Sequence, residues 1–196
     1  MPGSNERRGR PLLFATSNPG KLAEARQVLQ PLGFSVESCD AKGVEIQADT
    51  TAEVAAYSSR AAAKKLGKPL IVEDAGLFVE ALGGFPGVYS AYALRTIGLE
   101  GIIALLRRSQ SRKAKFVSSV AYCEPGGEPM VFEGSVRGTI ADAPKGSGGF
   151  GFDPIFIPRG GKKTFGQVTI EEKGALSHRG AALRKFARWR LGRSDG

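Results

Sequence analysis

Short apolar runs alternate with stretches of helical periodicity through the first half of this chain. In order, the pattern predicts a strand at 11–16, a helix at 22–32, a strand at 34–39, a helix at 51–66 and a strand at 70–72. Gly33 and Gly67 end the two helices, as glycine commonly does at a helix C-terminus. Strands separated by helices are typical of an α/β fold whose sheet is largely covered.

The second half of the chain is richer in loop and hairpin signals. The pattern predicts a loop at 81–88, a helix at 99–108, strands at 116–123 and 130–140 around the turn sequence PGG, and a basic helix at 179–191. Residues 1–10 are polar and basic, and we expect them to form a flexible extension. We expect residues 11–196 to form one domain, because a chain of 196 residues can bury one sizeable core.

The charge balance narrows the class of partner without fixing it. The formal net charge of +9 suits nucleic acid, an acidic membrane surface or phosphorylated small molecules. No apolar run approaches the roughly 20 residues that span a bilayer, and no secretory signal is expected. Cys39 and Cys123 do not make a disulfide framework, so we expect two reduced thiols and a cytoplasmic location.

The loop between the first predicted strand and helix is a candidate phosphate site. It consists of Thr16, Ser17, Asn18, Pro19, Gly20 and Lys21. Unpaired N–H groups and the positive end of the helix dipole favour phosphate at such a helix start. The loop is not a Walker A sequence, because the spacing fails at Ala15 and Leu22. An ordinary capped helix start explains the same residues equally well.

Acidic residues follow the strand predicted at 70–72. Glu73 and Asp74 stand at its expected carboxyl end, where open α/β sheets bind ligands. Carboxylates at this place attract Mg²⁺, or orient and deprotonate a water molecule. Alternation along a strand puts the two side chains on opposite faces, so at most one is expected to share a pocket with the ligand. Glu45 and Asp49 precede the second predicted helix and are further candidates.

Residues 146–156 (GSGGFGFDPIF) place glycines beside Phe150 and Phe152. This stretch is either a tight turn between strands or a backbone bent to admit a flat ligand. The single histidine, His178, stands beside Arg179, and with Lys173 these residues form a group of hydrogen-bond donors. Donors are what the 6-oxygen of a purine requires. A lone histidine is also commonly structural or exposed.

Four segments, in order, resemble one known family. ATSNPGK (15–21), VEDAGLFVEALGGFPGVYSA (72–91), GGFGFDPIF (148–156) and EEKGALSHR (171–179) are similar to the motifs of the inosine triphosphate pyrophosphatase family. The EIQADT and RTIGLEG sequences are similar to those of its archaeal members. The resemblance implies an α/β fold: an elongated mixed sheet with flanking helices, and two lobes around a central substrate cleft.

The resemblance also implies an activity and a set of site residues. Family members hydrolyse ITP, dITP and XTP to the nucleoside monophosphate and pyrophosphate, with Mg²⁺, and are generally homodimers. The triphosphate is then expected on the 16–21 loop, chiefly at Thr16, Asn18 and Lys21. The implied catalytic residues are Asp74, which is the metal-binding acid and water-activating base, Glu73 and Lys21; the second metal acid is Asp49 or Glu45. The implied base pocket consists of Phe150, Gly151, Phe152, Asp153, Lys173, His178 and Arg179.

The chain departs from the family pattern in several places. Ala75, a further expected substrate contact, replaces a serine of many members, and Phe152 replaces a tyrosine or tryptophan. Gly166, Gln167 and Gly174 are the other departures.

Two alternative functions stay open: a basic nucleic-acid-binding protein, and a related pyrophosphatase for modified pyrimidine triphosphates. The first has no RNP, KH or helix-turn-helix signature to support it, so we expect a nucleotide substrate and neither a nucleic acid nor a membrane as partner.

Overall fold

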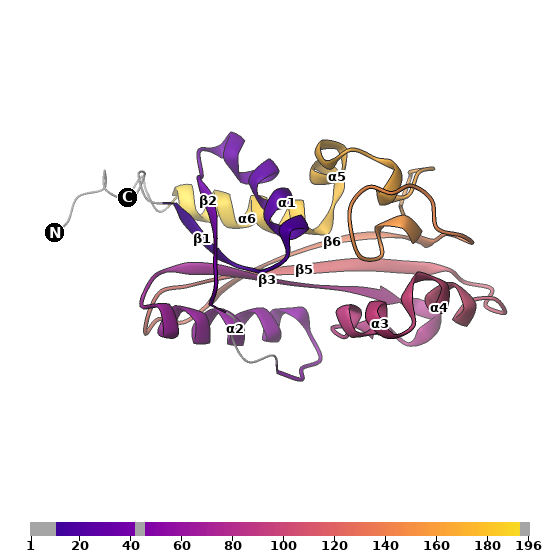
Figure 1. Cartoon of the computed structure of the whole chain (residues 1–196), viewed down its shortest axis with the longest axis horizontal. Helices are drawn as coiled ribbons and strands as arrows, with labels where there is room; N and C mark the ends of the chain where they lie inside the picture. Colours follow the sequence, from indigo (N-terminus) through magenta and orange to yellow (C-terminus); the bar gives the residue numbers. More distant parts are fainter. Residues whose placement is uncertain (1–10, 42–45, 193–196) are drawn as a thin grey trace.

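The computed structural model describes residues 11–41 and 46–192, and these form a mixed α/β structure around one twisted sheet (Figure 1). The strands are β1 (Leu12–Ala15), β2 (Val36–Cys39), β3 (Leu70–Val79), β4 (Pro86–Gly87), β5 (Lys113–Cys123), β6 (Met130–Ile140) and β7 (Phe156–Pro158). Their order is β2-β1-β3-β5-β6-β7, with β4 paired to β3. β1 is parallel to β2 and β3, and the other pairings are antiparallel. The expected mixed α/β fold is confirmed. The extension expected at residues 1–10 lies outside the described residues.

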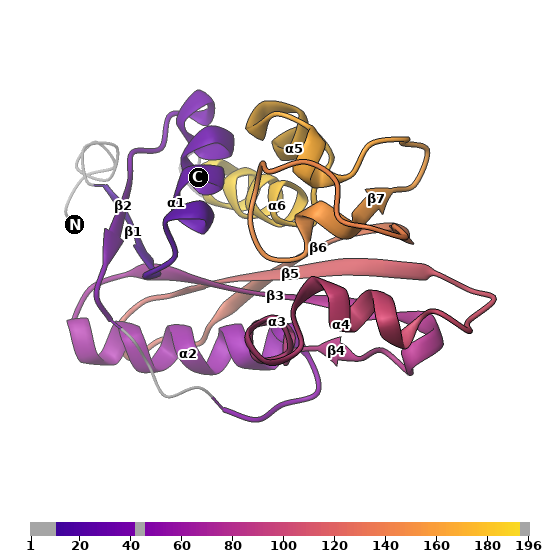
Figure 2. The ribbon, with the colours of Figure 1, turned by 45° about the vertical axis from the view of Figure 1, so that its right-hand side comes forward.

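Helices cover both sides of these strands. They are α1 (Pro19–Leu29), α2 (Thr51–Leu66), α3 (Ser90–Thr96), α4 (Gly98–Leu105), α5 (Ile170–Leu176) and α6 (His178–Gly192). Figure 1 shows α1, α5 and α6 on one side of the strands and α2 on the other, and Figure 2 shows α3 beside β4, with α4 next to α3. No helix in the described part of the chain is long and apolar enough to cross a membrane.

Local signals in the sequence fix the ends of the predicted helices. α1 begins after Asn18, whose side chain accepts the first free N–H groups, and Pro19 occupies the first turn, where its missing N–H costs nothing. α2 begins with a capping box between Thr50 and Glu53 and ends at Gly67, whose φ of 65° is the left-handed conformation that glycine adopts most easily. The helix predicted at 51–66 is therefore confirmed at both ends.

The structure differs from the predicted elements in several places. The strand predicted at 70–72 does not end at Glu73 and Asp74 but continues to Val79, because β5 pairs with β3 along its whole length from Leu70. α3 lies in a segment for which the pattern predicts no helix. Residues 146–152 are not a simple turn between strands; they lead into the short 3-10 helix Asp153–Ile155 before β7.

The buried hydrophobic residues that the structure describes form three clusters, two of which lie toward opposite ends of β3 and β5. One cluster joins α1 and α6 to the sheet around Phe14, Leu29 and Phe186. A second lies around Leu77 and Phe116, with residues of α3, α4 and β7. β3 and β5 contribute to both of these clusters, so the two clusters share strands. Cys39 and Cys123 are free thiols, as expected.

Candidate active site

The edge of β3 is open between two short neighbours. β1 pairs with β3 only at Phe14 and Ile71, and β4 pairs with it only from Leu77. Between these points, among the described strands, residues 73–76 pair only with β5. Glu73 and Asp74 therefore do not follow the end of their own strand, as the sequence predicted, but they lie just beyond the point where β1 ends. The loop that follows β1 lies at the same opening.

The 16–21 loop is held by its own side chains. The side-chain oxygen of Asn18 accepts hydrogen bonds from the N–H groups of Gly20 and Lys21, at 2.9 and 3.2 Å, and the Asn18 N–H donates to Thr16 Oγ1 at 3.1 Å. The capped helix start is thus present. The Lys21 ammonium extends to β3, where Nζ donates to the main-chain oxygen of Glu73 at 3.0 Å. Ser17 and Pro19 are exposed.

Glu73 is a buried carboxylate at the centre of several donors. Its Oε1 accepts hydrogen bonds from Arg179 Nε at 3.0 Å and from the Ser118 hydroxyl at 2.5 Å, and its Oε2 lies 3.0 Å from Lys21 Nζ. Burial opposes ionisation of Glu73 most strongly, but the charges of Arg179 and Lys21 and the Ser118 hydrogen bond outweigh it and hold its pKa well below the usual range. A carboxylate with so low a proton affinity is a weak general base. We therefore interpret Glu73 as a residue that positions Lys21 and Arg179.

A second buried carboxylate, Glu24, extends this network toward residues 150–153. Its Oε2 accepts from Arg179 at 2.5 Å and its Oε1 from Lys173 Nζ at 2.5 Å. Lys173 also pairs with Asp153, whose carboxylate accepts the Phe150 N–H at 2.8 Å. Burial raises the pKa of Asp153 more than Lys173 lowers it, whereas the pKa of Arg179, despite burial, is raised by Glu73 and Glu24. The contacts form one continuous chain of alternating charges: Lys21, Glu73, Arg179, Glu24, Lys173 and Asp153.

Phe150 covers the cations of this chain. Lys173 Nζ lies 4.9 Å and Arg179 Cζ 5.1 Å from the centre of its ring. The ring also rests against Gly20 so closely that a Cβ at Gly20 would come within 2.4 Å of it. Phe150 is half-buried, so part of its ring remains accessible for stacking. Gly151, the next residue, has a φ of 64°, the left-handed conformation that glycine adopts most easily.

Phe152 does not share that position. Its side chain is 3% exposed and packs in the core cluster around Leu77 and Phe116. The expectation that Phe152 offers a stacking surface is therefore wrong in this conformation: the residue anchors the segment and Phe150 alone presents a ring. Sequence spacing could not separate the two phenylalanines, because alternation does not apply in an irregular loop.

His178 is buried and stacks on Phe116, with ring centres 4.5 Å apart and planes 9° apart. Burial and the neighbouring Arg179 charge lower its pKa well below the usual value, so the imidazole is neutral at physiological pH. Among the described residues its Nδ1 has no hydrogen-bond partner. A buried polar atom left unpaired typically costs about 1–3 kcal/mol, so this atom is a candidate ligand contact.

Asp74 belongs to the other face of β3, as alternation predicted. It pairs across the strands with Ser119, whose hydroxyl lies 2.7 Å from the hydroxyl of Thr51 at the start of α2. Asp49 is exposed just before that helix, and Glu45 lies outside the described residues. Within residues 11–41 and 46–192, no group of three or more His, Cys, Asp or Glu side chains is arranged to hold a metal ion. The choice between Asp49 and Glu45 as second metal acid stays open.

Two residues of the network were not predicted from the sequence. Glu24 lies three positions after Lys21, so helical spacing places both on one side of α1, which was an available signal. Ser118 lies opposite Ala75 in the β3–β5 pairing and supplies a hydroxyl to Glu73 beside the position where many family members carry serine. No local pattern marks Ser118, because its role depends on strand pairing.

Comparisons with known proteins show which chains this one is similar to. The Ham1 family model matches residues 12–189. A relative from Methanopyrus kandleri, named dITP/XTP pyrophosphatase, is 54% identical over 178 residues, which cover 91% of this chain and 95% of the relative. A relative of the same name from Thermococcus kodakarensis is 54% identical over 178 residues, covering 91% and 96%.

Solved structures show the same similarity. The Ham1 protein of Staphylococcus aureus matches with a TM-score of 0.81 at 34% identity, over 94% of this chain and 100% of that chain. A nucleoside-triphosphatase, also named dITP/XTP pyrophosphatase, from Mycobacterium abscessus matches with a TM-score of 0.70 at 38% identity, over 90% and 98%. These matches confirm the resemblance that the sequence motifs predicted.

Proposed function

This chain belongs to the Ham1 family, and from that premise we propose that it hydrolyses the non-canonical purine triphosphates dITP, XTP and ITP. The products are the nucleoside monophosphate and pyrophosphate. Such an enzyme removes deaminated purines from the nucleotide pool, and we place it in the cytoplasm.

The observation that carries the proposal is the buried chain of charges beneath Phe150. It joins Lys21, at the helix start where phosphate is favoured, to Lys173 and Arg179, which lie against the aromatic ring. A triphosphate group and a flat base therefore have their contacts on one connected set of buried side chains. Such a set is pre-organised, because each member is held by neighbours before the substrate arrives.

Base selection follows from the donors near Phe150. Lys173 and Arg179 already donate to carboxylates, so a base would use their remaining N–H groups. The 6-oxygen of hypoxanthine or xanthine accepts from such donors, and neutral His178 supplies one more polar atom. The 6-amino group of adenine is itself a donor, so adenine leaves buried donors unpaired, which is costly.

Mg²⁺ is the metal that we propose. Asp74 fits it, because its carboxylate lies at an open, half-buried strand edge and Mg²⁺ is typically held by one or two carboxylates together with substrate phosphates. Asp49 or Glu45 would provide the second carboxylate. When bound, the ion polarises phosphate oxygens and lowers the pKa of coordinated water.

The bond changes define what the protein groups do. A water oxygen forms a bond to the α-phosphorus, and the bond from that phosphorus to the oxygen bridging the β-phosphorus breaks. The electron pair leaves with pyrophosphate, and Asp74 accepts the proton of the water. Lys21, fixed by Glu73, neutralises charge on the phosphate oxygens as it develops. Glu73 keeps its charge throughout.

Product analysis tests the proposal. The enzyme is incubated with ITP, dITP, XTP, ATP, GTP and a methylated pyrimidine triphosphate, with and without Mg²⁺. We expect pyrophosphate and the monophosphate from the first three substrates, and activity at least about 100-fold lower in Asp74→Asn. Asp142→Asn, which changes a carboxylate with 92% side-chain exposure, is the matched control and should keep full activity. Orthophosphate as the product, or preference for the pyrimidine, would contradict the proposal.

We propose that the enzyme acts as a homodimer through an aromatic surface patch. Phe85, Tyr89 and Tyr92, around β4 and α3, are 40%, 48% and 60% exposed. Adjoining exposed aromatic side chains commonly mark protein interfaces. Sedimentation should give a dimer for the wild type and a monomer for Tyr92→Glu. Tyr57→Glu changes a 46% exposed tyrosine on α2 and should stay dimeric; equal behaviour of the two variants would exclude this interface.

A further inference from the structure

A groove of about 940 Å³ lies at the end of the sheet away from β1. Strands β3, β5, β6 and β7 form its floor, and the segments 80–84 and 159–161 border it. None of the residues assigned above to the phosphate loop, the buried charge chain or the base pocket lines it. It is a separate site, and the inference below does not rest on the proposed function.

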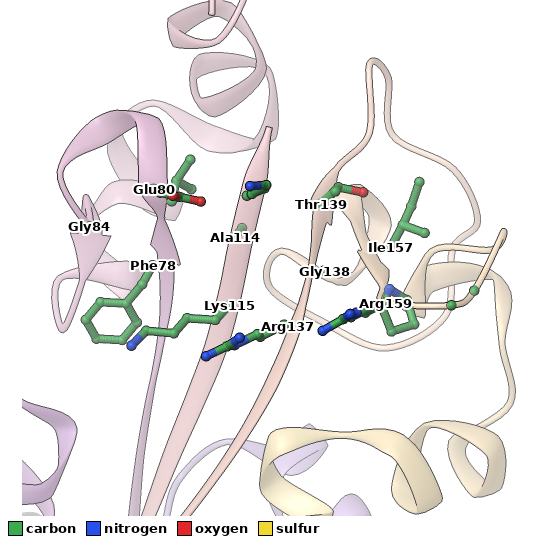
Figure 3. Close-up of a pocket in the computed structure, with 15 residues that line it drawn as sticks. Phe78, Glu80, Gly84, Ala114, Lys115, Arg137, Gly138, Thr139, Ile157 and Arg159 are labelled. Carbon is green, nitrogen blue, oxygen red and sulfur yellow. The ribbon is translucent and has the colours of Figure 1, made fainter. Parts of the chain in front are cut away.

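Basic side chains dominate the groove. Its charged lining residues are Lys113, Lys115, Arg137, Arg159 and one acid, Glu80. Figure 3 shows Phe78, Lys115, Arg137 and Arg159 in one row across the strands. The pairing explains this row, because Phe78 is opposite Lys115 and Lys115 is opposite Arg137, while the Arg159 N–H donates to the Arg137 main-chain oxygen at 2.8 Å.

Glu80 is a single acid against four basic residues, so the lining of the groove keeps an excess of positive charge. None of the four basic residues forms an ion pair within the described part of the chain, although Lys115 Nζ lies 5.6 Å from the centre of the Phe78 ring. Like charges directly opposite one another on paired strands destabilise a sheet. By contrast, the charged side chains that run from Lys21 to Asp153 in the active site are all paired, three basic with three acidic. An anion in the groove would remove this repulsion.

We propose that this groove binds a small polyphosphate anion, either inorganic pyrophosphate or the phosphate tail of a nucleotide. Its volume falls within the range of roughly 300–1,000 Å³ that is typical of small-molecule sites. Arginine forks and lysine ammonium groups are the usual partners of phosphate oxygens. The bordering segments at both ends favour a compact anion over a continuous nucleic-acid strand.

The test separates the groove from the active site by NMR. Pyrophosphate is titrated into the full-length protein at constant ionic strength, and the amide signals of Gly138 and Gly161 report on the groove while Gly20 reports on the phosphate loop. We expect both sets to shift in the wild type. In the double variant Lys115→Gln/Arg137→Gln, groove affinity should fall roughly tenfold or more, and the Gly20 titration should be unchanged.

The matched control removes the same charge elsewhere. Lys64→Gln/Lys65→Gln changes two exposed lysines of α2 and should keep wild-type groove affinity. A parallel titration with ATP identifies the source of the ligand: groove shifts with ATP but not pyrophosphate assign a nucleotide, and the reverse assigns the inorganic anion. Absence of groove shifts with both ligands would overturn the proposal. So would equal affinity in the two double variants, or tighter groove binding by a single-stranded oligonucleotide.

Discussion

Replacing Glu73 by glutamine tests the idea that this carboxylate holds the cations in place. The substitution keeps the shape of the side chain and removes its charge, so Lys21 loses its carboxylate partner and buried Arg179 keeps only Glu24. Removing one partner of a buried ion pair typically costs about 3–5 kcal/mol. For a chain of this size each kcal/mol lowers Tm by about 2–4 °C, so we expect a decrease of roughly 6–20 °C.

The pH dependence gives a second, independent readout. The folded state lowers the pKa of Glu73. Its contribution to the free energy of unfolding is therefore fully present above the usual glutamate pKa of about 4.3, and is lost as the pH falls toward the lowered folded-state pKa. Urea unfolding between pH 7 and pH 3 should therefore show a smaller loss of stability in Glu73→Gln than in the wild type.

A surface carboxylate provides the control. Glu128 also pairs with an arginine, Arg60, but its side chain is 86% exposed. Glu128→Gln should change the free energy of unfolding by about 0–1 kcal/mol, because water screens exposed pairs. If Glu73→Gln were no more destabilising than Glu128→Gln, and its pH profile matched the wild type, the proposed role of Glu73 as a charged anchor would be wrong.

Three further predictions concern single positions. Gly134→Ala should lower the free energy of unfolding by about 1–3 kcal/mol in urea titrations, because its Cβ would come within 2.1 Å of the main-chain oxygen of His178; an unchanged midpoint would contradict this contact. His178, the single histidine, should show no imidazole titration by NMR from pH 8 down to pH 5.5, since its folded-state pKa is lowered, and a midpoint near its usual value would disprove the burial argument. Gly20→Ala should raise KM for ITP several-fold by displacing the Phe150 ring, while Gly33→Ala, which meets no atom within 4 Å but has a φ of 87°, should affect stability only.

The sequence predicted both ends of α2, whereas α1 begins at Pro19 and ends at Leu29, three residues earlier at each end than the predicted helix at 22–32. The signals at these ends are local. Asn18, Thr50 and Gly67 act within a few residues of themselves, and each acts as its type suggests. Alternation likewise predicted that Glu73 and Asp74 face opposite sides, and their neighbours confirm it: Arg179 contacts Glu73, whereas Asp74 lies beside Ser119.

The features that the sequence did not predict depend on contacts between residues far apart in the chain. Lys173 meets Glu24 across 149 positions, and Arg179 meets it across 155, so no window of sequence reveals these contacts. The full length of β3 was missed for a related reason: Glu73, Asp74 and Gly76 interrupt its apolar run, and pairing with β5 decides the outcome. Tertiary packing also decides that Phe150 is half-buried whereas Phe152 is buried in the core.

The strands common to both core clusters limit how the molecule can open. β3, with 10 residues, extends over roughly 33 Å, and β5 accompanies it throughout. Two clusters joined by a flexible linker can separate, but two clusters built on the same pair of hydrogen-bonded strands cannot. If nucleotide entry needs an opening, we expect it from twisting of the paired strands or from displacement of the 146–152 segment, with the β3–β5 register unchanged.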